Sequence, residues 1–526
     1  MNAELGKSFT SEEIVDALSQ MCPTKAPGPN GLQVVFFQKH WQSVHKGLVT
    51  TCLHILNQQG NPSPINHTYI ALIPKVPKPE KVTNYRLISL CNVVYRIIMK
   101  AITNRMKPVL SQIISPTQSA FLPNRLITDN VIIGYECLHK IRNSKSKKNG
   151  LVALKLDISK AFDRVEWRFL QKTMEKLSFS KAFSNLLVRA EERQLIRSLR
   201  FVNDVTISHL LFADDSLIFT RASVAECNQL KEIFDCYTKA SRQMFNYKKS
   251  SMFFSGKILE AQIAAIKGIF KFKVVSKYEK YLGLPSMIGR NKMSFFNDVK
   301  LKVLYKISSW NHKMFSSGSR EVLIKAAAQA IPAYAISLFK LPRGLCNSIQ
   351  RAISRFWWGP KEDKRGIHWT RWEKLSHAKS RGGMGFRDLT CFNQALMAKQ
   401  RWRLLQLPNS LVSKVLQARY YRNSNFLSAS VGSNPSFIWR SILWGREVIK
   451  KGFRWRVGND KRVKPEVATA KAESILAAYQ RVRVPDNSHI DNSIKEKLQH
   501  WSPPLENCLK VNVDAAINNN DQMVRL

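Results

Sequence analysis

The chain has 526 residues, which is too long for one hydrophobic core and predicts about two to four domains. Hydrophobic residues make up 44% of it, and 83 Lys and Arg against 37 Asp and Glu leave a net charge of +46. So basic a surface attracts polyanions, of which nucleic acid is the commonest, and an anionic membrane is the competing partner.

Nothing in the sequence favours the membrane. The most apolar stretch, residues 323–339, is interrupted by Lys325, Gln329 and Pro332, so we expect a buried helix and a turn. The N-terminus carries acidic residues and has no signal-peptide core. The nine cysteines include no C-x-x-C pair, which argues against a zinc cluster or a disulfide framework and favours an intracellular protein.

The first third of the chain alternates helical and turn patterns. Thr10 or Ser11 can cap a helix that ends at Cys22-Pro23, and a stiff Pro/Gly turn at 25–31 follows. We then expect a helix carrying Phe36, Phe37 and Trp41, a strand at 69–75, and a helix over 93–110.

The middle of the chain predicts an α+β fold. Residues 151–157 form an apolar strand that ends on Asp157, and 159–177 predict a turn leading into a helix. A hairpin with Asp214-Asp215 at its apex comes next, then a helix over 224–241 and a strand at 251–254. This order is typical of an antiparallel sheet backed by helices.

Beyond about residue 257 the pattern is helical, basic and rich in tryptophan. Most of these Trp side chains are expected to fill cores, and stacking on nucleic-acid bases is the alternative. Residues 461–504 predict a polar linker, and 509–514 predict one more strand, ending on Asp514.

Asp214 and Asp215 are adjacent acids in an apolar hairpin. Like charges so close repel each other, so the pair favours a bound cation, whereas a solvated turn is the alternative. The usual cation is Mg²⁺, which binds one or two carboxylates together with substrate phosphates. Asp157, at the end of another strand, is a candidate third acid for two-metal phosphoryl transfer.

Several segments carry a resemblance to a known family. Residues 154–167 (LKLDISKAFDRVEW) resemble polymerase motif A of reverse transcriptases, and 212–215 (FADD) resemble their motif C. The chain is most similar to the reverse transcriptases of plant LINE-type (non-LTR) retrotransposons. The other matching segments are KAPGP at 25–29, LIPK at 72–75, YRLISLCN at 85–92, QSAF at 118–121, KYLGLP at 280–285, FWWG at 356–359, GGMGFR at 382–387 and FNQAL at 392–396.

The resemblance implies a right-hand polymerase with fingers, palm and thumb. Its regions would be a fingers-like part at 1–110, a palm at 111–256, and a thumb with a helical region at 257–460. The linker at 461–504 would lead into the start of a ribonuclease H-like domain at 505–526, with Asp514 as its first metal-binding acid.

The resemblance also implies the catalytic centre. Asp157 and Asp214 would bind two Mg²⁺ or Mn²⁺ ions, and Asp215 would support them. The partners would be an RNA template, a DNA primer and dNTPs, with no membrane, and the location would be nuclear. The oligomeric state is not specified.

Four further residues match positions that contact the nucleotide in the family. Lys75 and Arg86 would bind its triphosphate, with ordinary surface cations as the alternative. Phe162 would stack under the sugar and exclude a 2′-OH, or it is a buried palm residue. Lys249 would lie near the leaving pyrophosphate, although its neighbour Lys248 is equally available.

The chain also departs from the family. A block of the pattern Arg-Gln-Gly-Asp-Pro-Leu-Ser-Pro, expected between Asp157 and Asp214, is absent, so we predict an internal deletion or a mis-spliced gene model near residues 190–206. Leu87 replaces Pro, Asn30 replaces Asp, and both Asn124 and Arg242 replace Gly, in the last case at a turn expected to need positive φ. Relative to the family we expect truncation at both ends.

Three functions follow as hypotheses. The first is an RNA-directed DNA polymerase impaired by the deletion. The second is a catalytically inactive remnant that only binds nucleic acid through its charge. The third, a nucleic-acid-binding ribonuclease H fragment, lacks the acids that would accompany Asp514.

Overall fold

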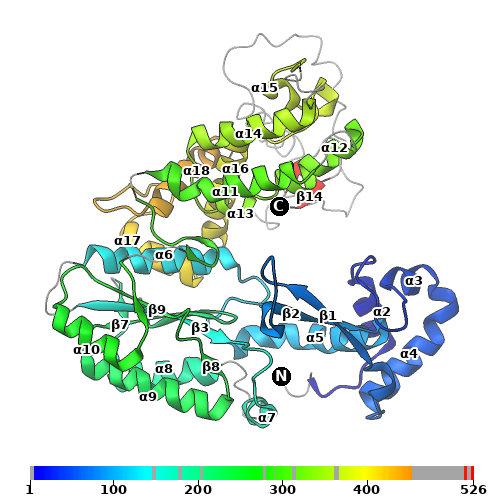
Figure 1. Ribbon diagram of the computed structural model, residues 1–526, viewed down its shortest axis with the longest axis horizontal. Helices are drawn as coiled ribbons and strands as arrows, with labels where there is room; N and C mark the ends of the chain where they lie inside the picture. Colours follow the sequence, from blue (N-terminus) through cyan, green and yellow to red (C-terminus); the bar gives the residue numbers. More distant parts are fainter. Residues whose placement is uncertain are drawn as a thin grey trace, which may run out of the picture. The chain divides into compact units, whose positions relative to one another are not determined.

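The computed structural model divides the chain into two compact units (Figure 1). The first comprises Met1–Ser115, Phe121–Arg125 and Trp167–Ser184, and the second Pro116–Ala120, Leu126–Glu166 and Asn185–Leu526. The structure describes residues 5–144, 150–175, 181–201, 205–276, 280–289, 291–310, 315–359, 367–452, 515–517 and 523–525.

The first unit is built around a small helical core. Thr10 caps its first helix in a reciprocal capping box, because its Oγ1 accepts from the Glu13 amide while the Glu13 carboxylate accepts from the Thr10 amide. Fully buried apolar residues such as Ile14, Val34 and Ile97 form the core. The helices are α2 (Ser11–Ser19), α3 (Val34–Lys39), α4 (Trp41–Asn57), α5 (Val93–Ile113) and α7 (Trp167–Glu175).

The same unit carries an antiparallel ribbon of two strands, β1 (Thr68–Pro74) and β2 (Tyr85–Cys91). The strand expected at 69–75 is confirmed. Apolar side chains of both strands are exposed, Ile70 to 61% and Leu87 to 51%. Short 3₁₀ turns, η1 (Ser63–Ile65) and η2 (Val82–Asn84), precede the two strands.

The second unit contains a six-stranded sheet with the order β10-β9-β3-β7-β6, to which β8 adds by pairing with β3. Its pairs are antiparallel except at one edge, where β10 runs parallel to β9. The predicted antiparallel sheet is therefore confirmed, with that one exception. The strands are β3 (Leu151–Ser159), β6 (His209–Phe212), β7 (Asp215–Arg221), β8 (Met244–Phe245), β9 (Ser251–Phe254) and β10 (Lys273–Val274).

Helices cover both faces of this sheet. Figure 1 shows α6 (Ile127–Asn143) on one face and α9 (Val224–Ser241) with α10 (Glu260–Phe270) on the other. The helix α8 (Lys181–Glu192) leads into a small hairpin of β4 (Leu199–Arg200) and β5 (Thr206–Ile207). The helix at 224–241 and the strand at 251–254 were predicted at their observed bounds. The helix expected within 159–177 begins only at Trp167.

The C-terminal part of the second unit is helical, as its pattern predicts. Its helices are α11 (Lys292–Ser308), α12 (Ser317–Leu323), the π-helix η4 (Ile324–Ala328), α13 (Ala333–Ile336), α14 (Arg343–Trp358), α15 (Trp372–Leu375), the 3₁₀ turn η5 (Lys379–Arg381), α16 (Leu389–Gln406), α17 (Leu411–Tyr420) and α18 (Phe437–Gly452). Short hairpins pair β11 (Lys280–Tyr281) with β12 (Leu284–Pro285) and β13 (Ala515–Ile517) with β14 (Met523–Arg525).

Aromatic packing dominates this helical core. The Trp439 side chain is fully buried, and its ring stacks on Tyr420 with centroids 4.6 Å apart. Trp369, by contrast, is 78% exposed, so it is not one of the tryptophans that fill the core. Phe339, at the end of the apolar stretch 323–339, is buried as expected, and none of the described helices is both long and apolar enough to cross a bilayer.

Two predicted features lie outside the described residues. They are the linker at 461–504 and Asp514, the acid assigned to a ribonuclease H-like strand.

Candidate active site

Asp157 lies at the end of the central strand β3. The side chains of Val152, Leu154 and Leu156 are fully buried and hold the strand in the middle of the sheet, whereas Asp157 is only half-buried. Its backbone is fixed on both sides, because the Asp157 amide donates to Ser250 Oγ at 3.3 Å and its carbonyl accepts from the Asn246 amide at 2.8 Å.

The hairpin β6–β7 brings the other two acids to the same end of the sheet. Phe212 pairs with Asp215, so Ala213 and Asp214 form a two-residue turn, in which Ala213 takes a positive φ of 52°. In the pairing of β3 with β7, Asp157 lies directly opposite Asp215. Directly opposed residues of an antiparallel pair point to the same face, so these two carboxylates share one face, and Asp214 is exposed on the adjoining turn.

The electrostatics of this end of the sheet are unbalanced. Burial raises the pKa of the Asp215 carboxyl, and the neighbouring charges of Asp214 and Asp157 raise it further. Lys155 and Lys249 act in the opposite direction. The arrangement therefore favours the binding of an additional cation beside these carboxylates.

Lys249 is the lysine next to the acids. Its Nζ lies 3.8 Å from Asp157 Oδ2, too far for a hydrogen bond, and its side chain is 70% exposed. Lys248 instead lines a pocket together with residues of α10 and β10. The structure thus distinguishes two neighbours that the sequence left equivalent.

A buried polar network braces the turn that carries Asp214. Gln118 Oε1 accepts from the amides of Ala120 and Ala213, at 3.0 and 3.4 Å. Asn130 Nδ2 donates to the Leu211 carbonyl at 2.8 Å, and Ser119 Oγ donates to Asn130 Oδ1 at 2.6 Å. We had not predicted this positioning role. The only signals were the polar residues Gln118-Ser119 in a matching segment and Asn130 within an apolar helix.

Phe162 follows β3 in the loop before α7. Its side chain is 95% exposed, so the alternative of a buried palm residue is wrong. An exposed ring is available to a ligand, whereas a ring packed in the core is not.

Lys75 and Arg86 lie together on the β1–β2 ribbon of the first unit. Lys75 follows the last residue of β1, its amide donates to the Asn84 carbonyl at 2.8 Å, and its Nζ donates to the Thr83 carbonyl at 3.2 Å. Arg86 is paired with Ile73 and is exposed. The ribbon therefore presents two cations at one end.

A metal centre made wholly of protein ligands is not present in the described part of the chain, where no three His, Cys, Asp or Glu side chains cluster closely enough. Carboxylates on β3 and on the β6–β7 turn fit a different kind of site. Mg²⁺ in nucleotide-processing sites keeps waters and takes one or two carboxylates, and substrate phosphates complete its shell.

An antiparallel sheet that is backed by helices and presents acids from a central strand and a neighbouring hairpin is a polymerase palm-like fold. The family model "Reverse transcriptase (RNA-dependent DNA polymerase)" matches residues 73–204, a range that includes Asp157 and ends before Asp214.

Three curated relatives are similar to this chain. An uncharacterized mitochondrial protein of Arabidopsis thaliana is 45% identical over 131 residues, which are 25% of this chain and 85% of the relative. A "Putative ribonuclease H protein" of Arabidopsis thaliana is 32% identical over 186 residues, 34% of this chain and 30% of the relative. The uncharacterized 149 kDa protein of transposon TX1 of Xenopus laevis is 25% identical over 426 residues, 72% of this chain and 32% of the relative.

The chain belongs to the reverse transcriptase family, which confirms the resemblance that its motifs carry. It spans only about a third of the length of the second and third relatives.

Proposed function

We propose that this chain is an RNA-directed DNA polymerase of a plant LINE-type (non-LTR) retrotransposon, which extends a DNA primer on an RNA template with dNTPs. The observation that carries the proposal is the cross-strand pairing of Asp157 with Asp215, next to the turn that presents Asp214. Residues 111–256 would be its palm, residues 1–110 its fingers, and a thumb would lie within 257–460. The name of the Xenopus relative, a transposon protein, supports this origin.

In this proposal Asp157 and Asp214 would hold two Mg²⁺ or Mn²⁺ ions, and Asp215 would support them. When bound, such ions lower the pKa of the primer 3′-OH and neutralise charge on the leaving pyrophosphate. The chain's own contribution is positioning. The Asp157 backbone is fixed by Ser250 and Asn246, and the Asp214 turn is fixed by Gln118.

The remaining site residues would act on the nucleotide. Lys75 and Arg86 would bind the triphosphate, and the exposed ring of Phe162 would lie against the sugar and exclude a 2′-OH. Lys249, 3.8 Å from Asp157, would stabilise the leaving pyrophosphate. Within the described residues, Lys249 Nζ donates no hydrogen bond. Its protons are therefore available to phosphate oxygens.

A second function is favoured by one observation. Between the end of α8 at Glu192 and the start of β6 at His209, the described residues form the small β4–β5 hairpin as their only regular secondary structure. The sequence there lacks the glycine-containing block of the family. A chain whose palm lacks that block would bind nucleic acid through its net charge of +46 and would incorporate no nucleotide.

Primer extension on an RNA template distinguishes the two functions. The purified chain should add dNTPs in the presence of Mg²⁺, and Asp214→Ala with Asp215→Ala should reduce extension to background. The matched control is Asp235→Ala, an exposed acid of α9. Extension by the unsubstituted chain that is no better than by the double variant would overturn the polymerase. If the chain in that case still binds nucleic acid strongly, with a steep salt dependence, the result supports the second function, a catalytically inactive remnant.

A further inference from the structure

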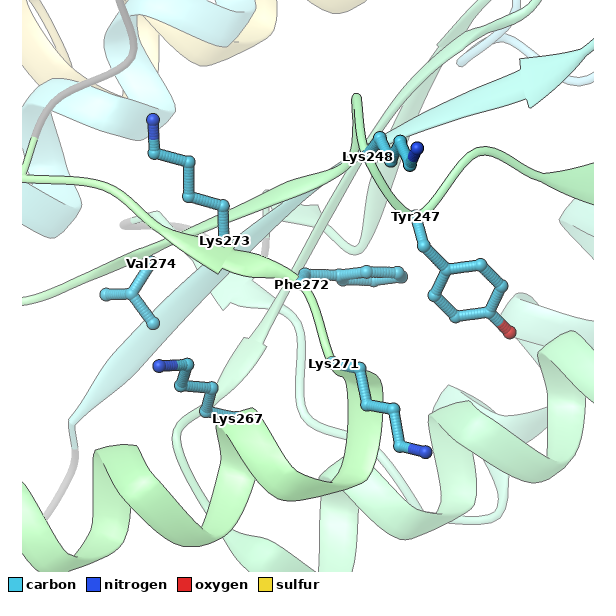
Figure 2. A pocket seen from close by; sticks show the side chains of 7 residues that line it. All are labelled: Tyr247, Lys248, Lys267, Lys271, Phe272, Lys273 and Val274. Carbon is cyan, nitrogen blue, oxygen red and sulfur yellow. The ribbon is translucent and has the colours of Figure 1, made fainter.

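A basic pocket lies at the edge of the sheet, between the loop that joins β8 to β9 and the edge strand β10. It has a volume of about 450 Å³ and is lined by seven residues (Figure 2). Four of them are lysines, Lys248, Lys267, Lys271 and Lys273, and the others are Tyr247, Phe272 and Val274. No acidic side chain is among the seven.

Three separate segments build this pocket. Tyr247 and Lys248 come from the loop between β8 and β9, Lys267 from the last turn of α10, and Lys273 with Val274 from the edge strand β10. Among the described strands, β10 pairs with β9 alone, so the pocket lies at the border of the sheet and opens to solvent. All four lysines are exposed.

Aromatic rings form the apolar part of the pocket. Phe272 is 2% exposed, and its ring lies 5.6 Å from that of Tyr247, which is 47% exposed. Phe270 stacks beneath Phe272 at 5.5 Å and holds it in place. Figure 2 shows the Phe272 ring directed toward Tyr247, with lysines on either side of the pair. The buried Phe272 ring thus supports the Tyr247 ring, which is about half exposed to solvent.

The charges of the pocket are not compensated by the protein. Among the described residues, no salt bridge involves any of the four lysines. Lys271 also ends α10 in the left-handed conformation, with φ of 57°, where glycine is favoured. Like charges gathered without a counter-ion repel one another, and a bound polyanion relieves that repulsion.

We infer that this pocket binds a single-stranded nucleic acid, with the lysines on its phosphates and a base stacked on Tyr247. Lysines beside an exposed aromatic ring are the combination by which proteins hold single strands without reading their sequence. The open border position favours a strand that passes through, whereas an isolated nucleotide would be held in an enclosed site.

The inference is independent of catalysis, although it shares a nucleic-acid partner with the proposed function. Its test therefore measures binding in EDTA, where no metal-dependent step takes place, and a chain that extends no primer still gives a result. Lys249 is left unchanged because it belongs to the candidate active site.

The experiment compares two triple variants by fluorescence anisotropy with a labelled single-stranded oligonucleotide at several salt concentrations. The pocket variant is Lys267→Gln, Lys271→Gln and Lys273→Gln. The control variant, Lys239→Gln, Lys257→Gln and Lys414→Gln, removes the same charge from exposed lysines elsewhere in the second unit. The pocket variant should bind at least about tenfold more weakly than the control, and the slope of log K against log salt should fall by about 2.

Tyr247 provides a second measurement. Tyr247→Ala should weaken binding about tenfold while Tyr247→Phe leaves it unchanged, because stacking needs the ring and not the hydroxyl. Circular dichroism and Tm confirm that each variant is folded. Equal affinities and slopes for the two triple variants would overturn the inference. Displacement of the oligonucleotide by millimolar mononucleotide in the unsubstituted chain, but not in the pocket variant, would overturn it in favour of a nucleotide site.

Discussion

The second unit contains two carboxylate sites, one whose charge is satisfied by neighbouring side chains and one whose charge is not. Glu136 of α6 is completely buried, and its carboxylate accepts from Tyr420 at 2.7 Å and from Ser436 while Arg419 lies 2.8 Å away. The acids at the end of the palm sheet face one another across β3 and β7, with the half-buried Lys155 and the exposed Lys249 as the opposing charges.

The difference separates structure from function. Burial raises the pKa of Glu136, but Arg419 and two hydroxyls oppose that effect, so the protein itself satisfies this acid and uses it to join α6 to α17 and α18. Within the part of the chain that the structure describes, the carboxylates of Asp157, Asp214 and Asp215 have no arginine or hydroxyl partner of this kind, and Lys249 Nζ lies 3.8 Å from Asp157 Oδ2. Acids that a protein brings together without satisfying are suited to a ligand that supplies the missing charge.

The largest expected effect is on the satisfied acid. Arg419→Ala should destabilise the folded chain by about 3–5 kcal/mol, because it leaves Glu136 buried without its cation. Denaturant unfolding followed by tryptophan fluorescence measures the change. Arg440→Ala, an exposed arginine of α18, is the matched control and should be nearly neutral. A loss of less than about 1 kcal/mol for Arg419→Ala would show that the network is not structural.

An intermediate effect concerns an exposed ion pair. Arg242 ends α9 with φ of 62°, and its side chain lies 3.3 Å from Glu166 with 75% of it exposed. Such a pair contributes little, whereas the left-handed backbone costs a side chain about 1 kcal/mol. Arg242→Gly should therefore stabilise the chain by about that amount, and Arg242→Ala, which keeps Cβ, should not. Equal destabilisation by both substitutions would mean that the ion pair outweighs the backbone.

The smallest effect is on the unsatisfied acids. The pKa of Asp215 is raised in the folded chain above its value of 3.8 in the unfolded chain. The folded state therefore loses stability as the pH rises above 3.8, because ionisation of Asp215 is less favourable in the folded chain. Asp215→Asn should thus raise Tm slightly at neutral pH, and the gain should shrink toward acidic pH, where the wild-type acid is protonated. The control is Asp235→Asn, at an exposed position of α9. A lower Tm for Asp215→Asn at neutral pH would contradict the account.

Local sequence patterns predicted the sheet better than its surroundings. The apolar run of β3 and the apolar flanks of the β6–β7 turn predicted these strands and their acids. The family resemblance, in which Arg242 replaces a glycine, correctly predicted the positive φ of this residue. Asn124, predicted on the same grounds to replace a glycine, also has positive φ.

Long-range contacts escaped prediction, because no local pattern encodes them. Glu136 meets partners almost 300 positions away, and Gln118 braces a turn 95 positions along the chain. The roles of Lys75, Arg86, Phe162 and Lys249 depend on a bound nucleotide, so they stay predictions.

The central claim is that the acids at the end of the palm sheet await a divalent cation, and Mn²⁺ binding tests it most directly. Electron paramagnetic resonance of free Mn²⁺ should show that the chain with a dNTP removes Mn²⁺ from solution, that Mg²⁺ competes, and that Asp157→Asn with Asp214→Asn abolishes this binding. The result does not depend on whether the shortened palm still catalyses. Equal Mn²⁺ uptake by the unsubstituted chain and the double variant would contradict the account.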